Sequence, residues 1–245
     1  MKAFVFVAAA LLLTSQLKAN ENIEKVIGRN DLVAVDAEAA NIPYRYQRLV
    51  DAFGIINMGC TATHIGKGYV LTAGHCFDAP MSVVRDQECA DVTVRWGVRE
   101  GKQAYLESQC EKIVAAQVTN NSDFAIFKVS PVPEASVAVD IRKPIAKGFK
   151  VTIFSHPDEL PLRWSQHCIV ERRLDDTFSL QTLQHKCDTN PGSSGATIID
   201  AFTNKVVGIH DGGYLSDYRL NRGMNYGTYL TNPDIVSVLS ELGFR

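Results

Sequence analysis

The chain has 245 residues, of which 25 are basic and 27 acidic, so its formal net charge at pH 7 is only −2. This near balance, with no basic tract, argues against nucleic acid or an anionic membrane surface as the main partner. The length suits one or two compact domains and is sufficient to bury a sizeable hydrophobic core.

Residues 1–19 have the pattern of a secretory signal peptide. Lys2 provides a positive start, an unbroken apolar run covers residues 4–13, and a polar stretch ends at the small residue Ala19. We therefore expect cleavage after Ala19 and a secreted or periplasmic protein. No later segment approaches the ~18 continuous apolar residues of a membrane-spanning helix, so we expect no stable membrane insertion.

The body of the chain is patterned as short strands separated by turns. Its segments are rich in β-branched and aromatic residues, which favours antiparallel sheets or barrels over βαβ units. The prolines within residues 130–144 would interrupt a central strand and indicate a linker. One helix is expected at the end, capped by Asn232, with Pro233 first and Gly243 closing it. The predicted strands are 92–96, 112–118, 124–129, 149–154, 196–200 and 206–210.

The six cysteines all lie beyond the signal peptide, and in an exported chain such a set favours three disulfide bonds. Their pattern lacks the paired two-residue spacings of a zinc site, so we expect no metal. Sequence alone cannot determine the pairing, but sequential pairing closes loops of modest length and is our prediction. The pairs would then be Cys60–Cys76, Cys89–Cys110 and Cys168–Cys187.

Three short motifs, in the order His, Asp, Ser, supply the groups of a nucleophilic hydrolase. In the string Thr-Ala-Gly-His-Cys of residues 72–76, small residues let a backbone turn bring the His75 imidazole to a cleft. Asp123 heads an apolar strand, where its carboxylate could accept the Nδ1 proton of His75 and hold the useful tautomer. A lone histidine or aspartate is more often structural, so the assignment depends on all three motifs together.

The third motif is Gly192-Ser193-Ser194-Gly195, and its Gly-x-Ser-Gly register selects Ser194 over Ser193 as the nucleophile. Gly192 lets the backbone bend so that its own amide and that of Ser194 form an oxyanion hole. We predict that His75 deprotonates Ser194, that Ser194 attacks a peptide carbonyl, and that water resolves the acyl-enzyme. This chemistry needs no metal and no organic cofactor.

The motifs around His75, Asp123 and Ser194 resemble those of the chymotrypsin-like serine peptidases, especially the bacterial branch that includes staphylococcal glutamyl endopeptidase. The resemblance implies an all-β fold of two packed antiparallel β-barrels of the chymotrypsin type, followed by a short C-terminal helix. The first barrel would comprise residues 26–136 with His75 and Asp123. The second barrel and the helix would comprise residues 137–245 with Ser194. A secreted serine endopeptidase is the implied function.

The start of the mature chain also bears on this resemblance. Residues 26–31 look like the first residues of mature enzymes in that branch, so processing after Lys25 would remove residues 20–25 as a short propeptide. The resemblance also implies the Cys60–Cys76 disulfide. Ser193 stands where animal trypsin-like enzymes carry an aspartate that captures the new N-terminal ammonium, so we do not expect their activation switch.

Two residues indicate opposite substrate preferences. Asp188 lies six residues before Ser194, where trypsin-like enzymes place the carboxylate that binds Lys or Arg, although an aspartate that braces the loop explains it equally well. His210 and Gly212 lie in a Gly-Ile-His-x-Gly-Gly string where glutamate-specific relatives use a histidine. An imidazole donates a hydrogen bond to a carboxylate, and strand alternation directs Asp211 to the opposite face. We favour acidic residues on the acyl side of the cut.

Two other functions fit the same residues. The fold could serve as a catalytically silent binding module, although binding alone would not need all three groups of a triad. An exported serine esterase would use the same acyl-enzyme chemistry on a different substrate. As a peptidase, the chain is expected to act as a monomer on proteins or peptides.

Overall fold

The computed structural model describes residues 26–171, 182–213 and 223–245. The expected signal peptide and propeptide therefore lie outside the described residues. In the described part of the chain, no helix is long and apolar enough to cross a membrane. The α-helices are α1 (Tyr44–Gln47) and α2 (Pro233–Glu241), with single 3-10 turns at Val50–Ala52, Gly74–Phe77 and Pro157–Glu159.

The first sheet closes on itself as a barrel. Its strand order is β5-β7-β6-β2-β3-β4-β8, and the additional pairing of β7 with β8 closes every strand except β5 into a ring. All of its ladders are antiparallel. The strands are β2 (Phe53–Ile56), β3 (Cys60–Gly66), β4 (Tyr69–Thr72), β5 (Val84–Gln87), β6 (Thr93–Trp96), β7 (Leu106–Thr119) and β8 (Ser122–Ser130).

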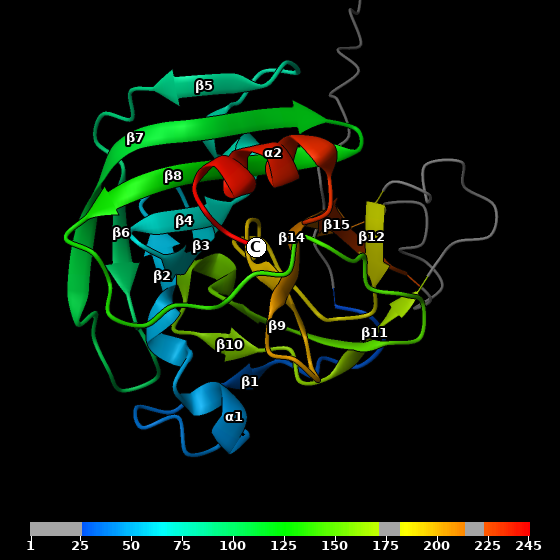
Figure 1. Ribbon diagram of the computed structural model, residues 1–245. Helices are drawn as coiled ribbons and strands as arrows, with labels where there is room; N and C mark the ends of the chain where they lie inside the picture. The colour runs from blue at the N-terminus through cyan, green and yellow to red at the C-terminus, as the bar shows by residue number, and fades with distance from the viewer. Residues whose placement is uncertain (1–25, 172–181, 214–222) are drawn as a thin grey trace, which may run out of the picture.

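The second sheet forms the other barrel. Its order is β1-β10-β9-β11-β12-β15-β14-β13, and the pairing of β9 with β13 closes the ring, with β1 and β10 outside it. Figure 1 shows the two barrels beside each other, so the predicted fold class is confirmed. The strands are β1 (Val33–Ala34), β9 (Lys150–Ser155), β10 (Arg163–Trp164), β11 (Cys168–Glu171), β12 (Thr182–His185), β13 (Thr197–Asp200), β14 (Val206–Gly213) and β15 (Asn225–Tyr229).

Three apolar clusters hold this architecture together. One fills the first barrel, one fills the second, and the largest lies between the barrels and beneath α2. In the cluster between the barrels, the rings of Phe53 on β2 and Phe154 on β9 stack with their centroids 5.1 Å apart. Each side chain of this size stabilises the fold by about 1.5–3 kcal/mol when buried. The junction between the barrels is therefore a packed core, and it positions the groups described below.

The C-terminal helix begins where the sequence predicts. The side chain of Asn232 accepts a hydrogen bond from the Asp234 amide at 2.9 Å, and Pro233 occupies the first turn. Ile235, Val238 and Leu239 are buried in the cluster between the barrels. Helix α2 thus stabilises the junction by burying its apolar face there.

The N-terminal segment joins the second barrel. Val33 and Ala34 pair with Trp164 and Arg163 of β10, although the sequence assigned residues 26–136 to the first barrel. An apolar strand of two residues carries no signal of which sheet edge it will extend, so this pairing was not predictable. The boundary near residue 136 stays a prediction; it falls in the connection between β8 and β9.

The three disulfides follow the predicted sequential pairing. They are Cys60–Cys76, Cys89–Cys110 and Cys168–Cys187. The first ties the turn after β4 to β3, and the third ties β11 to the segment that follows β12. Two of the three disulfides therefore fix segments that lead directly to the candidate site.

Candidate active site

The turn that carries His75 follows directly on β4. Gly74 permits the turn, because a Cβ at this position would lie 2.2 Å from the carbonyl oxygen of Gln117 on β7. The Cys60–Cys76 disulfide anchors the next residue to β3. The imidazole is thereby held at the junction of the barrels.

Asp123, the second residue of β8, binds His75 through both carboxylate oxygens. Its Oδ2 lies 2.6 Å from His75 Nδ1, and its Oδ1 accepts the backbone amide of His75 at 2.9 Å. The residue is only 5% exposed. Because a carboxylate can only accept, the imidazole carries its proton on Nδ1 and leaves Nε2 as an acceptor.

Ser194 completes the contact. Its Oγ lies 2.8 Å from His75 Nε2, so the hydroxyl donates to the unprotonated nitrogen. The neighbouring Ser193 is buried, and its Oγ donates to Ser155 Oγ on β9 at 3.0 Å. The structure thus brings together the base, carboxylate and nucleophile that the sequence indicates, and directs Ser193 elsewhere.

The loop before Ser194 is held from outside the site. The Asp158 amide donates to the Pro191 carbonyl at 2.6 Å. Because a trans peptide is planar with its N–H opposite its C=O, the amide of Gly192 points away from Asp158. Gly192 has φ +95°, and a Cβ there would lie 2.8 Å from both the Asp158 nitrogen and the His156 oxygen. Only glycine fits this place.

Thr61 on β3 supports the same loop, although it was not among the predicted site residues. Its amide donates to the Ser194 carbonyl at 2.9 Å, and its hydroxyl donates to the Gly192 carbonyl at 2.8 Å. The hydroxyl also accepts the His156 amide at 2.9 Å. Its only sequence signal is its position beside Cys60, so this role had to come from the structure.

Asp211 is set apart from His210 by a bulge in β14. His210 pairs with Gly227 and Gly212 pairs with Tyr226, so Asp211 is the extra residue. The Asp211 Oδ2 accepts the Thr228 hydroxyl at 2.8 Å. Gly212 lies buried beyond the bulge. The bulge therefore directs Asp211 to the barrel junction, whereas His210 contacts the interior of the second barrel.

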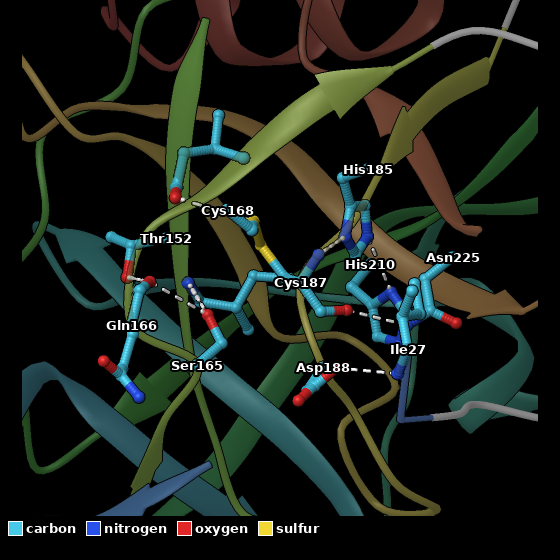
Figure 2. Close-up of a disulfide and its surroundings, with 12 residues drawn as sticks. Ile27, Thr152, Ser165, Gln166, Cys168, His185, Cys187, Asp188, His210 and Asn225 are labelled. Carbon is cyan, nitrogen blue, oxygen red and sulfur yellow. Dashed lines mark hydrogen bonds between the residues drawn. A yellow bond between two sulfur atoms is a disulfide. The ribbon is translucent and has the colours of Figure 1, made fainter. Parts of the chain in front are cut away.

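His210 forms a buried pair with His185 of β12 (Figure 2). The Cys187 amide donates to His185 Nδ1 at 3.3 Å, so the His185 proton is on Nε2. That nitrogen lies 3.2 Å from His210 Nδ1, and the His210 ring also hydrogen-bonds the backbone of Tyr226. Burial lowers the pKa of His185 to about 3 and that of His210 well below its ordinary value. Both imidazoles are therefore neutral near pH 7.

Asp188 contacts the N-terminal segment. Its Oδ1 accepts the amide of Ile27 and its Oδ2 accepts the amide of Asp31, each at 2.7 Å. Figure 2 shows the hydrogen bond between Ile27 and Asp188 beside the Cys168–Cys187 disulfide. The carboxylate that the sequence offered for a basic substrate thus has backbone amides on both oxygens.

Among the residues that the structure describes, two groups of side chains have the spacing of metal ligands but not the chemistry. Cys60, Cys76 and His75 form one group, and Cys168, Cys187 and His185 form the other. In each group the two sulfurs are joined as a disulfide. A disulfide has no thiolate, which is the form of cysteine that binds a metal.

Comparison with known proteins identifies the family and the fold. The model of the trypsin-like peptidase domain matches residues 60–209, more than half of the chain. No curated protein sequence matches the chain. A structure of a Glu endopeptidase has 20% sequence identity and a TM-score of 0.64, with 89% of this chain and 98% of that chain covered.

Two further structures share the fold at similar distance. An inactive form of the protease Rv3671c from M. tuberculosis H37Rv has 15% identity and a TM-score of 0.57, with 86% of this chain and 95% of that chain covered. The serine endoprotease from Yersinia pestis has 15% identity and a TM-score of 0.54, with 82% and 67% covered. Sequence family and barrel architecture agree, and the chain therefore belongs to the family of trypsin-like serine peptidases.

Proposed function

We propose that the chain is an exported endopeptidase in which His75, Asp123 and Ser194 act as a catalytic triad. The observation that carries this proposal is the unbroken relay from Asp123 Oδ2 through the imidazole to Ser194 Oγ, with steps of 2.6 and 2.8 Å. The 2.8 Å distance suits proton transfer from Ser194 to a positioned general base, and the 2.6 Å contact holds the imidazole in place for that transfer.

The relay supports a two-step hydrolysis. His75 Nε2 takes the hydroxyl proton as Ser194 Oγ attacks the scissile carbonyl, and Asp123 stabilises the imidazolium without taking its proton. His75 then gives this proton to the leaving amine, which departs and leaves an acyl-enzyme. Water, deprotonated by the same imidazole, then attacks the ester carbonyl, and the imidazolium returns this proton to Ser194 Oγ as the bond to the acyl product breaks.

The amides of Gly192 and Ser194 are proposed to bind the oxyanion of the tetrahedral intermediate. The contact from Asp158 to the Pro191 carbonyl supports this role, because it fixes the orientation of the Gly192 peptide before substrate arrives. A preorganised donor of this kind is worth about 2.7–4 kcal/mol in the transition state.

Acidic residues on the acyl side of the cut are the proposed preference. His210 supports it, since an imidazole N–H can donate to a substrate carboxylate, and His185 lies 3.2 Å from its Nδ1 and orients the ring. Gly212 follows two residues later on the same strand. Asp188 is occupied by the amides of Ile27 and Asp31, which counts against Lys or Arg. The fold shared with a protein named as a Glu endopeptidase is consistent with this choice.

An oxidising compartment fits the three disulfides. Together with the signal-like pattern of residues 1–19, they support a secreted or periplasmic location. A monomer acting on protein or peptide substrates is the simplest form consistent with a site made from one chain.

The test is to digest a denatured protein mixture with the secreted protein and to map every cut by mass spectrometry, with Ser194→Ala as the matched control. Cuts after Glu or Asp that disappear in the control are expected. Cuts after Lys or Arg would overturn the proposed preference. Labelling by a serine-reactive phosphonate separates a peptidase from a silent binding module, which would not react. Turnover of esters without any peptide cleavage would favour the esterase.

A further inference from the structure

Asp188 is a buried carboxylate bound by the backbone of the N-terminal segment. The amides of Ile27 and Asp31 donate to its two oxygens at 2.7 Å, and the residue is 4% exposed. Hydrogen bonds to an ionised acceptor are stronger than those between neutral groups. Burial raises the pKa of Asp188 above its ordinary value, and the two amides oppose that rise. The contact is therefore specific to a carboxylate with both oxygens available.

The segment that supplies these amides is itself fixed to the second barrel. The Asp31 carbonyl accepts Gln166 Nε2 at 2.9 Å. A few residues later β1 pairs with β10, and the Val35 amide donates to the Leu162 carbonyl at 3.0 Å. The amides that Asp188 binds are thus attached to a stable framework.

On its other side, Asp188 begins the loop that leads to the nucleophile. Only Thr189, Asn190 and Pro191 separate it from Gly192. The preceding residue, Cys187, is anchored by its disulfide and by Asn225 Nδ2, which donates to its carbonyl at 2.8 Å. Asp158 and Thr61 hold the carbonyls of Pro191 and Gly192 at the far end of this loop, and Asp188 fixes the near end, so a displacement of Asp188 would strain the stretch that leads to the Gly192 amide.

We propose that Asp188 is a positioning residue that fastens residues 26–31 to the loop 188–194 and so sets the Gly192 amide for oxyanion binding. This rests on the proposed peptidase function and goes beyond it by making catalysis depend on the N-terminal segment. The link differs from the animal switch, in which the residue beside the nucleophile captures an ammonium. Here the carboxylate stands at the start of the loop and captures two backbone amides.

The experiment compares the secreted protein with Asp188→Asn and Asp188→Ala. Asp36→Asn is a matched control, because the Asp36 carboxylate also accepts two backbone amides, from Ala40 and Asn41 at 2.8 and 3.1 Å. Hydrogen exchange at the Ile27 and Asp31 amides reports the contact directly. Active sites are titrated with a serine-reactive phosphonate, and kcat and KM are measured on peptides with acidic, basic and apolar residues before the cut.

Asp188→Ala is expected to accelerate exchange at both amides by about tenfold or more, the loss of one or two net hydrogen bonds. Per titrated site, kcat should fall by roughly 10–100-fold with KM little changed, since oxyanion donors act in the transition state. The factor should be the same for every peptide. Asp188→Asn, which keeps one acceptor oxygen, should lie between Ala and wild type, and Asp36→Asn should change neither readout.

Three results would overturn the proposal. Unchanged exchange at Ile27 and Asp31 would show that the amides do not depend on Asp188. A loss confined to peptides with Lys or Arg would make Asp188 a substrate-binding residue. A smaller titrated fraction with unchanged kcat per site would make it purely structural. If the wild-type protein neither reacts with phosphonate nor cleaves peptides, the proposed peptidase function fails and the positioning role fails with it, while exchange still decides whether the contact exists.

Discussion

The backbone amide of Asp123 donates to the hydroxyl of Thr228 at 2.8 Å, which ties β8 of the first barrel to β15 of the second. The Thr228 hydroxyl in turn donates to Asp211 Oδ2 at 2.8 Å. All three residues are buried. Because one barrel carries His75 and the other carries Ser194, this link sets the position of Asp123 relative to Ser194.

Replacing Thr228 by valine is therefore expected to lower catalysis. Valine keeps the shape but removes the acceptor of the Asp123 amide and the donor to Asp211, and each orphaned group costs about 1–3 kcal/mol. We expect kcat/KM to fall roughly tenfold and the unfolding free energy to drop by about 2 kcal/mol. Thr228→Ser keeps the hydroxyl and should recover most of the activity. Equal activity of the two variants would contradict the role of this hydrogen-bond chain.

Gly192→Ala probes the loop that carries the proposed oxyanion donors. The new Cβ would lie 2.8 Å from the Asp158 nitrogen and the His156 oxygen, at φ +95°. The backbone must shift, and the amide moves with it. We expect kcat to fall by about 10²–10³ with KM little changed, as for loss of one oxyanion donor. Steady-state kinetics decide this, and circular dichroism must show that the barrels are intact. A variant with wild-type kcat would exclude the Gly192 amide from the oxyanion hole.

Local sequence signals were sufficient for much of the fold. The predicted strand 92–96 corresponds to β6, and the cap at Asn232 is present. Strand β3 (Cys60–Gly66) is buried along nearly its whole length although it carries threonines. Thr63 hydrogen-bonds Thr197 across the barrels at 3.0 Å, so polar side chains that normally indicate an exposed face are internal here.

The candidate site was predictable only in part, because some of its contacts join residues that lie far apart in the sequence. The His75, Asp123 and Ser194 motifs are short strings whose chemistry is visible locally. The partners of the Asp188 carboxylate and of the Asp123 backbone amide are not visible locally. The Ile27 amide lies 161 residues from Asp188, and Thr228 lies 105 residues from Asp123. No periodicity indicates which distant amide or hydroxyl a buried carboxylate or amide will meet. Such contacts follow from barrel closure and pairing, which one sequence does not specify.

The free energy of unfolding should decrease as the solution is acidified, because two histidines are buried in their neutral form. Burial lowers the pKa of His156 to about 4 and that of His185 to about 3, from an ordinary value of 6.5. Between those values and 6.5 the unfolded chain binds more protons than the folded one. The stability present above about pH 6.5 is then lost as pH falls, by about 1.4 kcal/mol per pH unit for each histidine.

Urea unfolding measured at several pH values from about 7 to 5 tests this expectation. His156→Gln keeps a donor for the Leu160 carbonyl, which lies 3.0 Å from His156 Nδ1, but it cannot titrate. The slope of its unfolding free energy against pH should be shallower than that of the wild-type protein, by the amount that corresponds to about one proton bound on unfolding. An unchanged slope, or stability that rises on acidification, would contradict the assignment.

The buried histidine pair makes a prediction about the proposed specificity. His185 Nε2 lies 3.2 Å from His210 Nδ1 and so orients the His210 ring. His185→Leu removes this contact, so the ring proposed to meet a substrate carboxylate loses the neighbour that holds it. We expect kcat/KM for peptides with glutamate before the cut to fall by roughly tenfold, the loss of a charge-assisted hydrogen bond, and that for matched leucine peptides to change much less. His185→Gln retains an N–H donor and should preserve more of the preference. Equal losses on both peptides would mean that the histidine pair serves packing, and the preference for acidic residues would then need another source.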